Sequence, residues 1–123
     1  MANILVLDDV QEITVLLQRI LESAGHEVAV ACSVKDALDV LSKGPTDLVI
    51  TDIFMPDRDG LEFIKDIRAR YPSIKILVIS GGGKNFPAQP FLTLAQHSGA
   101  QQTLMKPFGP AALRQAVSEL LST

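Results

Sequence analysis

Apolar and polar residues follow one another along the chain in two kinds of pattern. Residues 3–7, with the sequence NILVL, form a short apolar run bounded by polar residues, which is typical of a strand buried on both faces. Over residues 13–21, apolar residues recur at the three- and four-residue spacing of one helix face. The members of this stripe are Ile13, Leu16, Leu17, Ile20 and Leu21. The chain is therefore predicted to begin with a strand and an amphipathic helix.

The two patterns continue to alternate to the end of the chain. Strands are expected over residues 3–7, 26–31, 47–52, 74–79 and 101–105. Helical segments are expected around residues 13–21, 37–41, 61–71, 91–98 and 113–121. Strands that alternate with helices form a parallel sheet covered on both faces and joined by right-handed crossovers. The pattern predicts an α/β fold, a single (βα)5 doubly wound domain with a five-stranded parallel sheet over residues 1–123.

Composition places the chain among ordinary globular domains. Its 123 residues are 47% hydrophobic and 20% charged, which is enough for one buried core. The net charge of −3 gives no electrostatic reason to expect nucleic-acid binding. Because no apolar run approaches the roughly 18 residues of a membrane span, we expect no membrane partner.

The amino terminus and the cysteine content point to the cytoplasm. The start, MANILVLDD, lacks the basic region, apolar segment and cleavage site of a secretory signal. Cys32 is the sole cysteine and cannot form an internal disulfide, which fits a reducing compartment. We expect Cys32 to be a small core residue. His26 and His97 lack partners at metal-ligand spacing and are expected at the surface.

Chemically active side chains follow four of the five predicted strands. Asp8 and Asp9 come after the first strand, Asp52 ends the third, Ser80 follows the fourth, and Lys106 follows the fifth. The carboxyl ends of parallel strands lie at one edge of the sheet, where such folds bind their ligands. Three carboxylates, one hydroxyl and one amine are therefore expected to converge.

This set of groups favours metal-assisted phosphoryl transfer. Each pair of carboxylates about 4 Å apart repels by roughly 1 kcal/mol even in water, so a positive charge must compensate. Mg²⁺, or Mn²⁺ in its place, is the cofactor expected, because it binds one or two carboxylates together with waters and phosphate oxygens. Lys106 supplies a further positive charge. Asp52 is the nucleophile in this interpretation, and the cation and Lys106 neutralise the transferred group.

Each acidic residue also has a simpler explanation. Asp8 and Asp9 are typical of a solvated strand end that caps a helix, and Asp52 of a residue that starts a turn. Asp57 and Asp59, in the sequence PDRDG, are assigned to turn chemistry and helix capping.

Taken in order, four segments resemble the receiver domain of response regulators in two-component signalling. They are the pair Asp8-Asp9, the segment DIFMPDRDG from Asp52, Ser80 after ILVI, and KPF from Lys106. The resemblance covers essentially the full length. It implies a CheY-like, flavodoxin-like sheet with strand order 2-1-3-4-5, and a signalling switch that catalyses only its own phosphorylation and dephosphorylation.

The resemblance also implies how the acidic residues act. Asp52 would accept the phosphoryl group from a phosphohistidine of a sensor kinase. Asp9 and Asp52 would bind the metal directly, and Asp8 mostly through water. The backbone carbonyl of Phe54 would be the third protein ligand.

The remaining implied roles concern the phosphorylated state. Ser80 would move to bond a phosphate oxygen, and Lys106 would pair with the phosphate or with Asp52. The bond between Lys106 and Pro107 would be cis, which costs roughly 0.5–1 kcal/mol before proline. The chain departs from the family at Thr103, where a tyrosine or phenylalanine usually takes part in the switch. A threonine cannot fill that volume, so the aromatic half of the switch is not expected here.

The expected partners are proteins. A sensor histidine kinase or a phosphotransfer protein would supply the phosphoryl group, and a downstream effector protein or output domain would receive the signal. The chain is either a stand-alone regulator or part of a longer one, with a homodimer possible. Two alternatives are a Mg²⁺-dependent phosphohydrolase and a pseudo-receiver that binds partners without phosphorylation. The first needs an acid two residues after the nucleophile, where Phe54 stands, and the complete site argues against the second.

Overall fold

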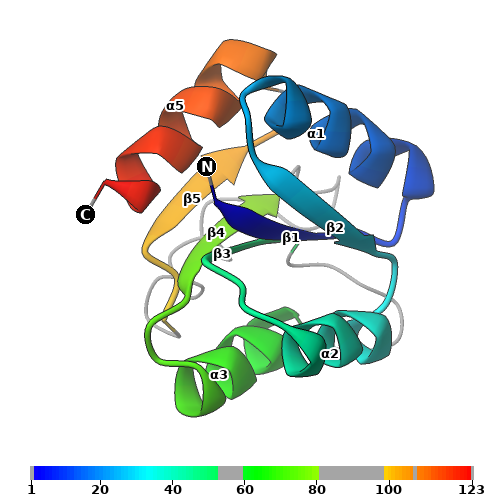
Figure 1. Cartoon of the computed structure of the whole chain (residues 1–123), viewed down its shortest axis with the longest axis vertical. Helices are drawn as coiled ribbons and strands as arrows, with labels where there is room; N and C mark the ends of the chain where they lie inside the picture. Colours follow the sequence, from blue (N-terminus) through cyan, green and yellow to red (C-terminus); the bar gives the residue numbers. More distant parts are fainter. Residues whose placement is uncertain (1, 53–59, 81–98, 107, 123) are drawn as a thin grey trace, which may run out of the picture.

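The computed structural model describes residues 2–52, 60–80, 99–106 and 108–122, and Figure 1 shows their arrangement. In chain order the elements are β1 (Asn3–Leu7), α1 (Gln11–Ser23), β2 (Glu27–Ala31), α2 (Val34–Lys43), β3 (Leu48–Asp52), α3 (Gly60–Arg70), β4 (Lys75–Ser80), β5 (Gln102–Met105) and α5 (Pro110–Leu121). Each predicted strand is confirmed with its first residue within one position of the expected start. The helix expected around residues 91–98 lies outside the described residues.

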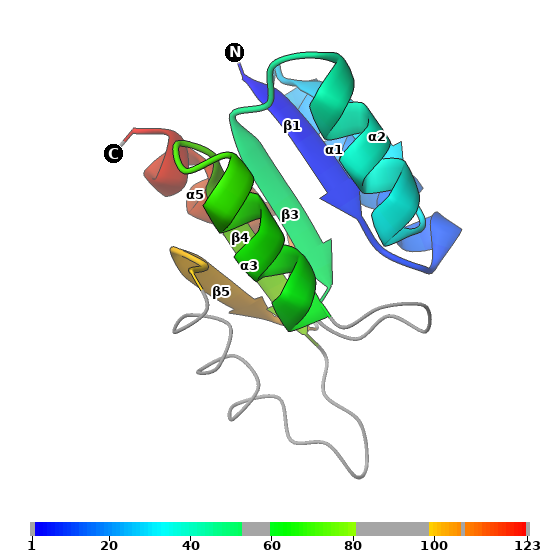
Figure 2. The ribbon, with the colours of Figure 1, turned by 90° about the horizontal axis from the view of Figure 1, so that it is seen from below.

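The strands form one sheet in the order β2-β1-β3-β4-β5, and every neighbouring pair is parallel. Figure 2 shows β1, β3 and β5 pointing the same way. Leu7 at the end of β1 lies opposite Ala31 of β2 and Thr51 of β3. This arrangement confirms the predicted strand order and places the carboxyl ends of the strands along one edge.

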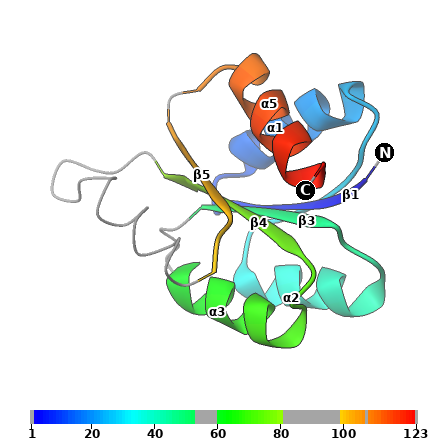
Figure 3. The same cartoon turned by 90° about the vertical axis from the view of Figure 1, so that its left-hand side faces the viewer.

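The helices cover the two faces of the sheet in pairs, α1 with α5 on one face and α2 with α3 on the other (Figure 3). Each face has its own apolar core. One core includes Leu5, Val49 and Phe63, and the other includes Val6 and Leu113. Since β1 and β3 lie between both layers, their aliphatic side chains are buried whichever way they point, as the sequence pattern predicts.

The end of α3 is tied to the residues that lead into β5. The guanidinium of Arg68 donates to the carbonyl of Pro72 at 2.6 Å and to the carbonyl of Gly99 at 3.0 Å. Gly99 has a φ of +127°, and a Cβ there would lie 3.2 Å from Nε of Arg68. Glycine is needed at this position, because a side chain would strain the main chain at this φ and would crowd Arg68.

One expectation about a single side chain is wrong. Cys32 is exposed, because it follows β2, which is an edge strand of the sheet. Leu16 belongs to the predicted stripe of α1 but is 53% exposed, whereas Leu17 and Leu21 of the same stripe are buried. His26 is partly buried and accepts a hydrogen bond from the N–H of Ala2 at 3.2 Å through Nδ1. His97 lies outside the described residues.

Within the part of the chain that the structure describes, none of the helices has both the length and the apolar character needed to span a membrane.

Candidate functional site

The edge formed by the carboxyl ends of the strands brings the predicted acidic residues together. Asp52 ends β3, and Asp8 follows β1 directly. Because Leu7 lies opposite Thr51 in the register, the next residues of the two strands, Asp8 and Asp52, are neighbours across the sheet. The ends of β4 and β5 lie at the same edge, since Ser80 is opposite Met105 and Lys106 follows it.

Carboxylate oxygens of Asp8, Asp9 and Asp52 lie within 4.8 Å of one another. Asp8 is 0% exposed and Asp52 is 9% exposed, while Asp9 faces the solvent. Several carboxylates in so small a space suit a hard divalent cation with oxygen ligands. Mg²⁺ keeps several of its waters, and the exposure of Asp9 leaves the cluster open to solvent on one side. The donor set therefore fits Mg²⁺.

Lys106 bridges the two buried carboxylates. Its Nζ lies 3.3 Å from Oδ2 of Asp8 and 3.3 Å from Oδ2 of Asp52. The other oxygen of Asp8, Oδ1, accepts the backbone N–H of Val10 at 2.9 Å, just before α1 begins. Both oxygens of Asp8 thus have donors within the protein. The idea that Asp8 is merely a solvated strand end is wrong, because its side chain is completely buried.

Burial and charge act against each other at this cluster. Burial raises the pKa of Asp8 above its ordinary value of 3.8, although the Val10 N–H and the Lys106 ammonium act in the opposite direction. Burial by itself disfavours the charged form of Lys106. The attraction of Asp52 and Asp8 outweighs that effect and raises the pKa of Lys106 above its ordinary value of 10.5. Lys106 is therefore a cation at neutral pH.

Replacing Asp8 with asparagine is expected to raise the free energy of unfolding by about 1 kcal/mol at neutral pH. Asparagine can still accept the Val10 N–H, but it removes a charge that burial disfavours. Because the pKa of Asp8 is raised in the folded protein, the folded state binds this proton more readily than the unfolded chain. The advantage of the variant should therefore shrink as the pH falls through the folded-state pKa. Urea unfolding of both proteins from neutral to acidic pH measures the difference. An advantage that grows towards acidic pH would contradict this electrostatic account.

The other predicted site residues lie along the same edge or outside the described part. Ser80 is the last residue of β4. Thr103 lies in β5, opposite Val78, and is partly buried. Phe54 and Pro107 lie outside the described residues, so the implied metal contact of Phe54 and the cis bond of Pro107 stay predictions.

One polar side chain next to the cluster could not be assigned a role from the sequence pattern. Thr51 is completely buried at the end of β3, and its hydroxyl donates to the backbone carbonyl of Asp52 at 2.9 Å. The signal was a hydroxyl residue that closes an otherwise aliphatic run, Leu48 to Ile50.

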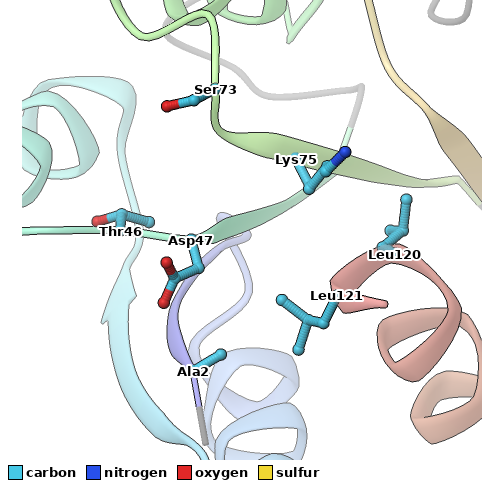
Figure 4. Close-up of a pocket in the computed structure, with 7 residues that line it drawn as sticks. All are labelled: Ala2, Thr46, Asp47, Ser73, Lys75, Leu120 and Leu121. Carbon is cyan, nitrogen blue, oxygen red and sulfur yellow. The ribbon is translucent and has the colours of Figure 1, made fainter. Parts of the chain in front are cut away.

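A hollow of about 470 Å³ lies at the opposite end of the sheet, among the residues that precede or begin β1, β3 and β4 and the end of α5 (Figure 4). Asp47 and Lys75 are its charged residues. Oδ2 of Asp47 accepts the backbone N–H of Asn3 at 2.8 Å, and the carbonyl of Asp47 accepts the N–H of Lys75 at 3.0 Å. These groups join the starts of three strands. Because ligands of open parallel sheets bind at the carboxyl ends, we assign this hollow to the framework.

A second hollow adjoins the acidic cluster. It has a volume of about 300 Å³ and lies between α1 and the residues around the start of α5. Its lining is Ile13, Leu16, Leu17, Ile20, Lys106, Phe108 and Pro110. Among the described residues that line this apolar groove, Lys106 alone is charged, and it also contacts Asp8 and Asp52. The exposure of Leu16 is explained by its place on the wall of the groove.

The fold and the acid–lysine cluster define a doubly wound α/β domain with its site at the carboxyl edge of the sheet. Residues 4–118 match the family described as the response regulator receiver domain. The chain therefore belongs to the receiver domain family of two-component signalling, and its fold is the CheY-like flavodoxin fold.

Individual relatives agree with this assignment. The chemotaxis protein CheY of Thermotoga maritima is 31% identical over 119 residues, which are 96% of this chain and 96% of that protein. The alkaline phosphatase synthesis transcriptional regulatory protein PhoP of Bacillus subtilis is 31% identical over 97% of this chain, which spans only 48% of PhoP. A receiver domain protein from Clostridium thermocellum has a crystal structure with a TM-score of 0.90 and 29% identity, covering 99% of this chain and 95% of that one. Relatives thus include both single receivers and longer regulators.

Proposed function

We propose that this receiver domain, over residues 1–123, is switched by phosphorylation of Asp52. The observation that carries the proposal is the position of the Asp52 carboxylate, which shares one small cluster with two further carboxylates and contacts Lys106 at 3.3 Å. One carboxylate acts as the nucleophile, and the others with the lysine stabilise charge around the transferred group. The protein catalyses no reaction other than its own phosphorylation and dephosphorylation.

Mg²⁺, or Mn²⁺ in its place, belongs to the proposal. Asp9 and Asp52 would hold it directly, Asp8 would act mostly through water, and the carbonyl of Phe54 would be a further ligand. The bound cation supplies positive charge for the oxygens of the phosphoryl group. Lys106 remains beside Asp52 and stabilises the same charge from the protein side. Ser80, at the end of β4, completes the set as the hydroxyl that bonds a phosphate oxygen.

The proposed partners are a sensor histidine kinase or phosphotransfer protein, and a downstream effector protein or output domain in a cytoplasmic pathway. The apolar groove between α1 and α5 supports a phosphodonor partner, which is the kinase or the phosphotransfer protein. Lys106 lines the groove and also contacts Asp52, so a phosphodonor protein that covers the exposed Leu16 comes close to the phosphate acceptor. The proposal also includes a homodimer of the chain.

Replacing Asp52 with alanine is expected to abolish incorporation of phosphate from acetyl phosphate in the presence of Mg²⁺. The variant lacks the nucleophile, whereas wild-type protein should take up one phosphoryl group that intact-protein mass spectrometry detects. The matched control is Asp39→Ala, an exposed aspartate of α2 whose carboxylate pairs with Lys43, and it should label like wild type. Equal labelling of Asp52→Ala and wild type would overturn the proposal. Steady turnover of a small phosphoester would favour the phosphohydrolase instead.

Phe54 is expected to prolong the phosphorylated state. It stands two residues after Asp52, where receiver domains place a side chain that faces the phosphate and its attacking water, and a phenyl ring cannot orient water by hydrogen bonding. Phe54→Asn or Phe54→Glu should shorten the lifetime of the phosphoprotein by about tenfold, a change of about 1.4 kcal/mol in the barrier. The decay is followed by mass spectrometry after removal of acetyl phosphate. An unchanged lifetime in both variants would show that the ring does not shield the phosphate.

A further inference from the structure

Thr51 is a buried hydroxyl residue in an apolar setting. Its partners in the sheet register are Leu7 of β1 and Val78 of β4, and both are completely buried in the core beneath α2 and α3. A valine has nearly the same shape and would suit these neighbours. A buried hydroxyl is costly unless it is hydrogen-bonded, so the place of this hydroxyl requires an explanation.

The hydroxyl is bonded to the residue that carries the phosphate acceptor. Oγ1 of Thr51 donates to the backbone carbonyl of Asp52 at 2.9 Å, and the bond is buried. The direction of this carbonyl is set by the ψ angle of Asp52. A buried hydrogen bond to the carbonyl therefore restrains the main chain from which the Asp52 side chain extends.

The position of that side chain has little freedom to vary. Its carboxylate shares the 4.8 Å cluster with Asp8 and Asp9, and its Oδ2 lies 3.3 Å from Nζ of Lys106. A small rotation of the Asp52 main chain would change both the position of the carboxylate in the cluster and its distance from Lys106. Groups that orient metal ligands through hydrogen bonds typically lower the metal affinity by about 10–100-fold when they are removed.

We propose that Thr51 is a positioning residue, whose hydroxyl fixes the main chain of Asp52 so that the carboxylate is held in place for a divalent cation and Lys106. This inference rests on the proposed function, because it takes the Asp8–Asp9–Asp52 cluster as the cation site. Thr51 contacts neither the cation nor the phosphate and acts only through Asp52.

The test compares Thr51→Val, which removes the hydroxyl, with Thr51→Ser, which keeps it. Mg²⁺ alone is titrated into each protein by calorimetry, and urea unfolding is measured in metal-free buffer. Thr51→Val should bind Mg²⁺ about tenfold more weakly, while its stability falls no further than that of Thr51→Ser, because the buried carbonyl of Asp52 loses a donor but valine suits the apolar surroundings. Thr51→Ser should keep an affinity within about twofold of wild type, even though it loses a buried methyl group and some stability. The Mg²⁺ affinity then separates the two variants although their stability does not, which a merely structural role of Thr51 would not produce.

Wild-type affinity in Thr51→Val would overturn the inference, and so would an equal loss of affinity in both variants. A second measurement separates this inference from the proposed function. In metal-free protein, the carbonyl carbon-13 resonance of Asp52 should shift in Thr51→Val and stay near its wild-type position in Thr51→Ser. If the wild type binds no Mg²⁺, the proposed cation site fails, and the resonance of Asp52 still decides the role of Thr51. An unshifted Asp52 resonance in Thr51→Val would overturn the proposed role of Thr51.

Discussion

Lys106→Ala is expected to lower the free energy of unfolding by about 2 kcal/mol in metal-free buffer, because two largely buried carboxylates lose their common cation. The figure is below the full cost of breaking a buried pair, since the side chain of Lys106 is 28% exposed. Mg²⁺ should restore more stability to the variant than it adds to wild type, because the cation then supplies positive charge that Lys106 no longer provides. Phosphorylation by acetyl phosphate should slow by about 100-fold.

Urea unfolding with EDTA and with Mg²⁺ measures the stability effect of Lys106. Lys43→Ala is the matched control, because its Nζ pairs with Asp39 at 2.9 Å but its side chain is 73% exposed. That variant should lose no more than about 0.5 kcal/mol. If Lys106→Ala is as stable as wild type without metal, the charge balance described for the cluster is wrong.

Phe63→Ala is expected to cost about 3–5 kcal/mol of the free energy of unfolding, the largest stability loss among the variants considered. Phe63 of α3 is completely buried in the core between the sheet and the helices α2 and α3. Removal of the ring leaves a cavity in the layer that also holds Leu7 and Val49, which lie in the two central strands that lead to Asp8 and Asp52. Such a loss is a large part of the stability of an ordinary domain.

Leu16→Ala provides the comparison for Phe63, because Leu16 is also a large apolar helix residue but is 53% exposed. Its loss should stay within about 0.5 kcal/mol. Both variants are measured by urea unfolding followed by circular dichroism. Equal losses in the two variants would contradict the assignment of α3 to the core layer and of Leu16 to the groove wall.

The sequence predicts the sheet well because its strands and helices have different apolar periods. Leu48 to Ile50 form a continuous apolar run, and the structure buries that run completely between two helix layers. Asp8 and Asp52 could be placed together because both follow central parallel strands, whose carboxyl ends meet by topology. The apolar pattern and the strand topology are therefore enough to predict the sheet and the meeting of Asp8 and Asp52.

Other features depend on three-dimensional packing, which a linear pattern does not contain. The stripe of α1 includes Leu16 at the correct helical spacing, but spacing does not reveal that this side chain lies on the wall of a groove and stays 53% exposed. Cys32 is a small residue of a type often buried, yet it follows an edge strand. The contact of Thr51 with the carbonyl of Asp52 and the bridging position of Lys106 require the register of neighbouring strands and real interatomic distances.

The central claim is that Asp52 is the residue that becomes phosphorylated, with the help of Mg²⁺. It is tested most directly by treating the protein with acetyl phosphate and Mg²⁺, reducing the acyl phosphate with borohydride, and locating the resulting homoserine by peptide mass spectrometry. We predict homoserine at position 52 alone, and none when EDTA replaces Mg²⁺. Homoserine at Asp8 or Asp9, or a modification of Asp52 that does not depend on the metal, would contradict the account.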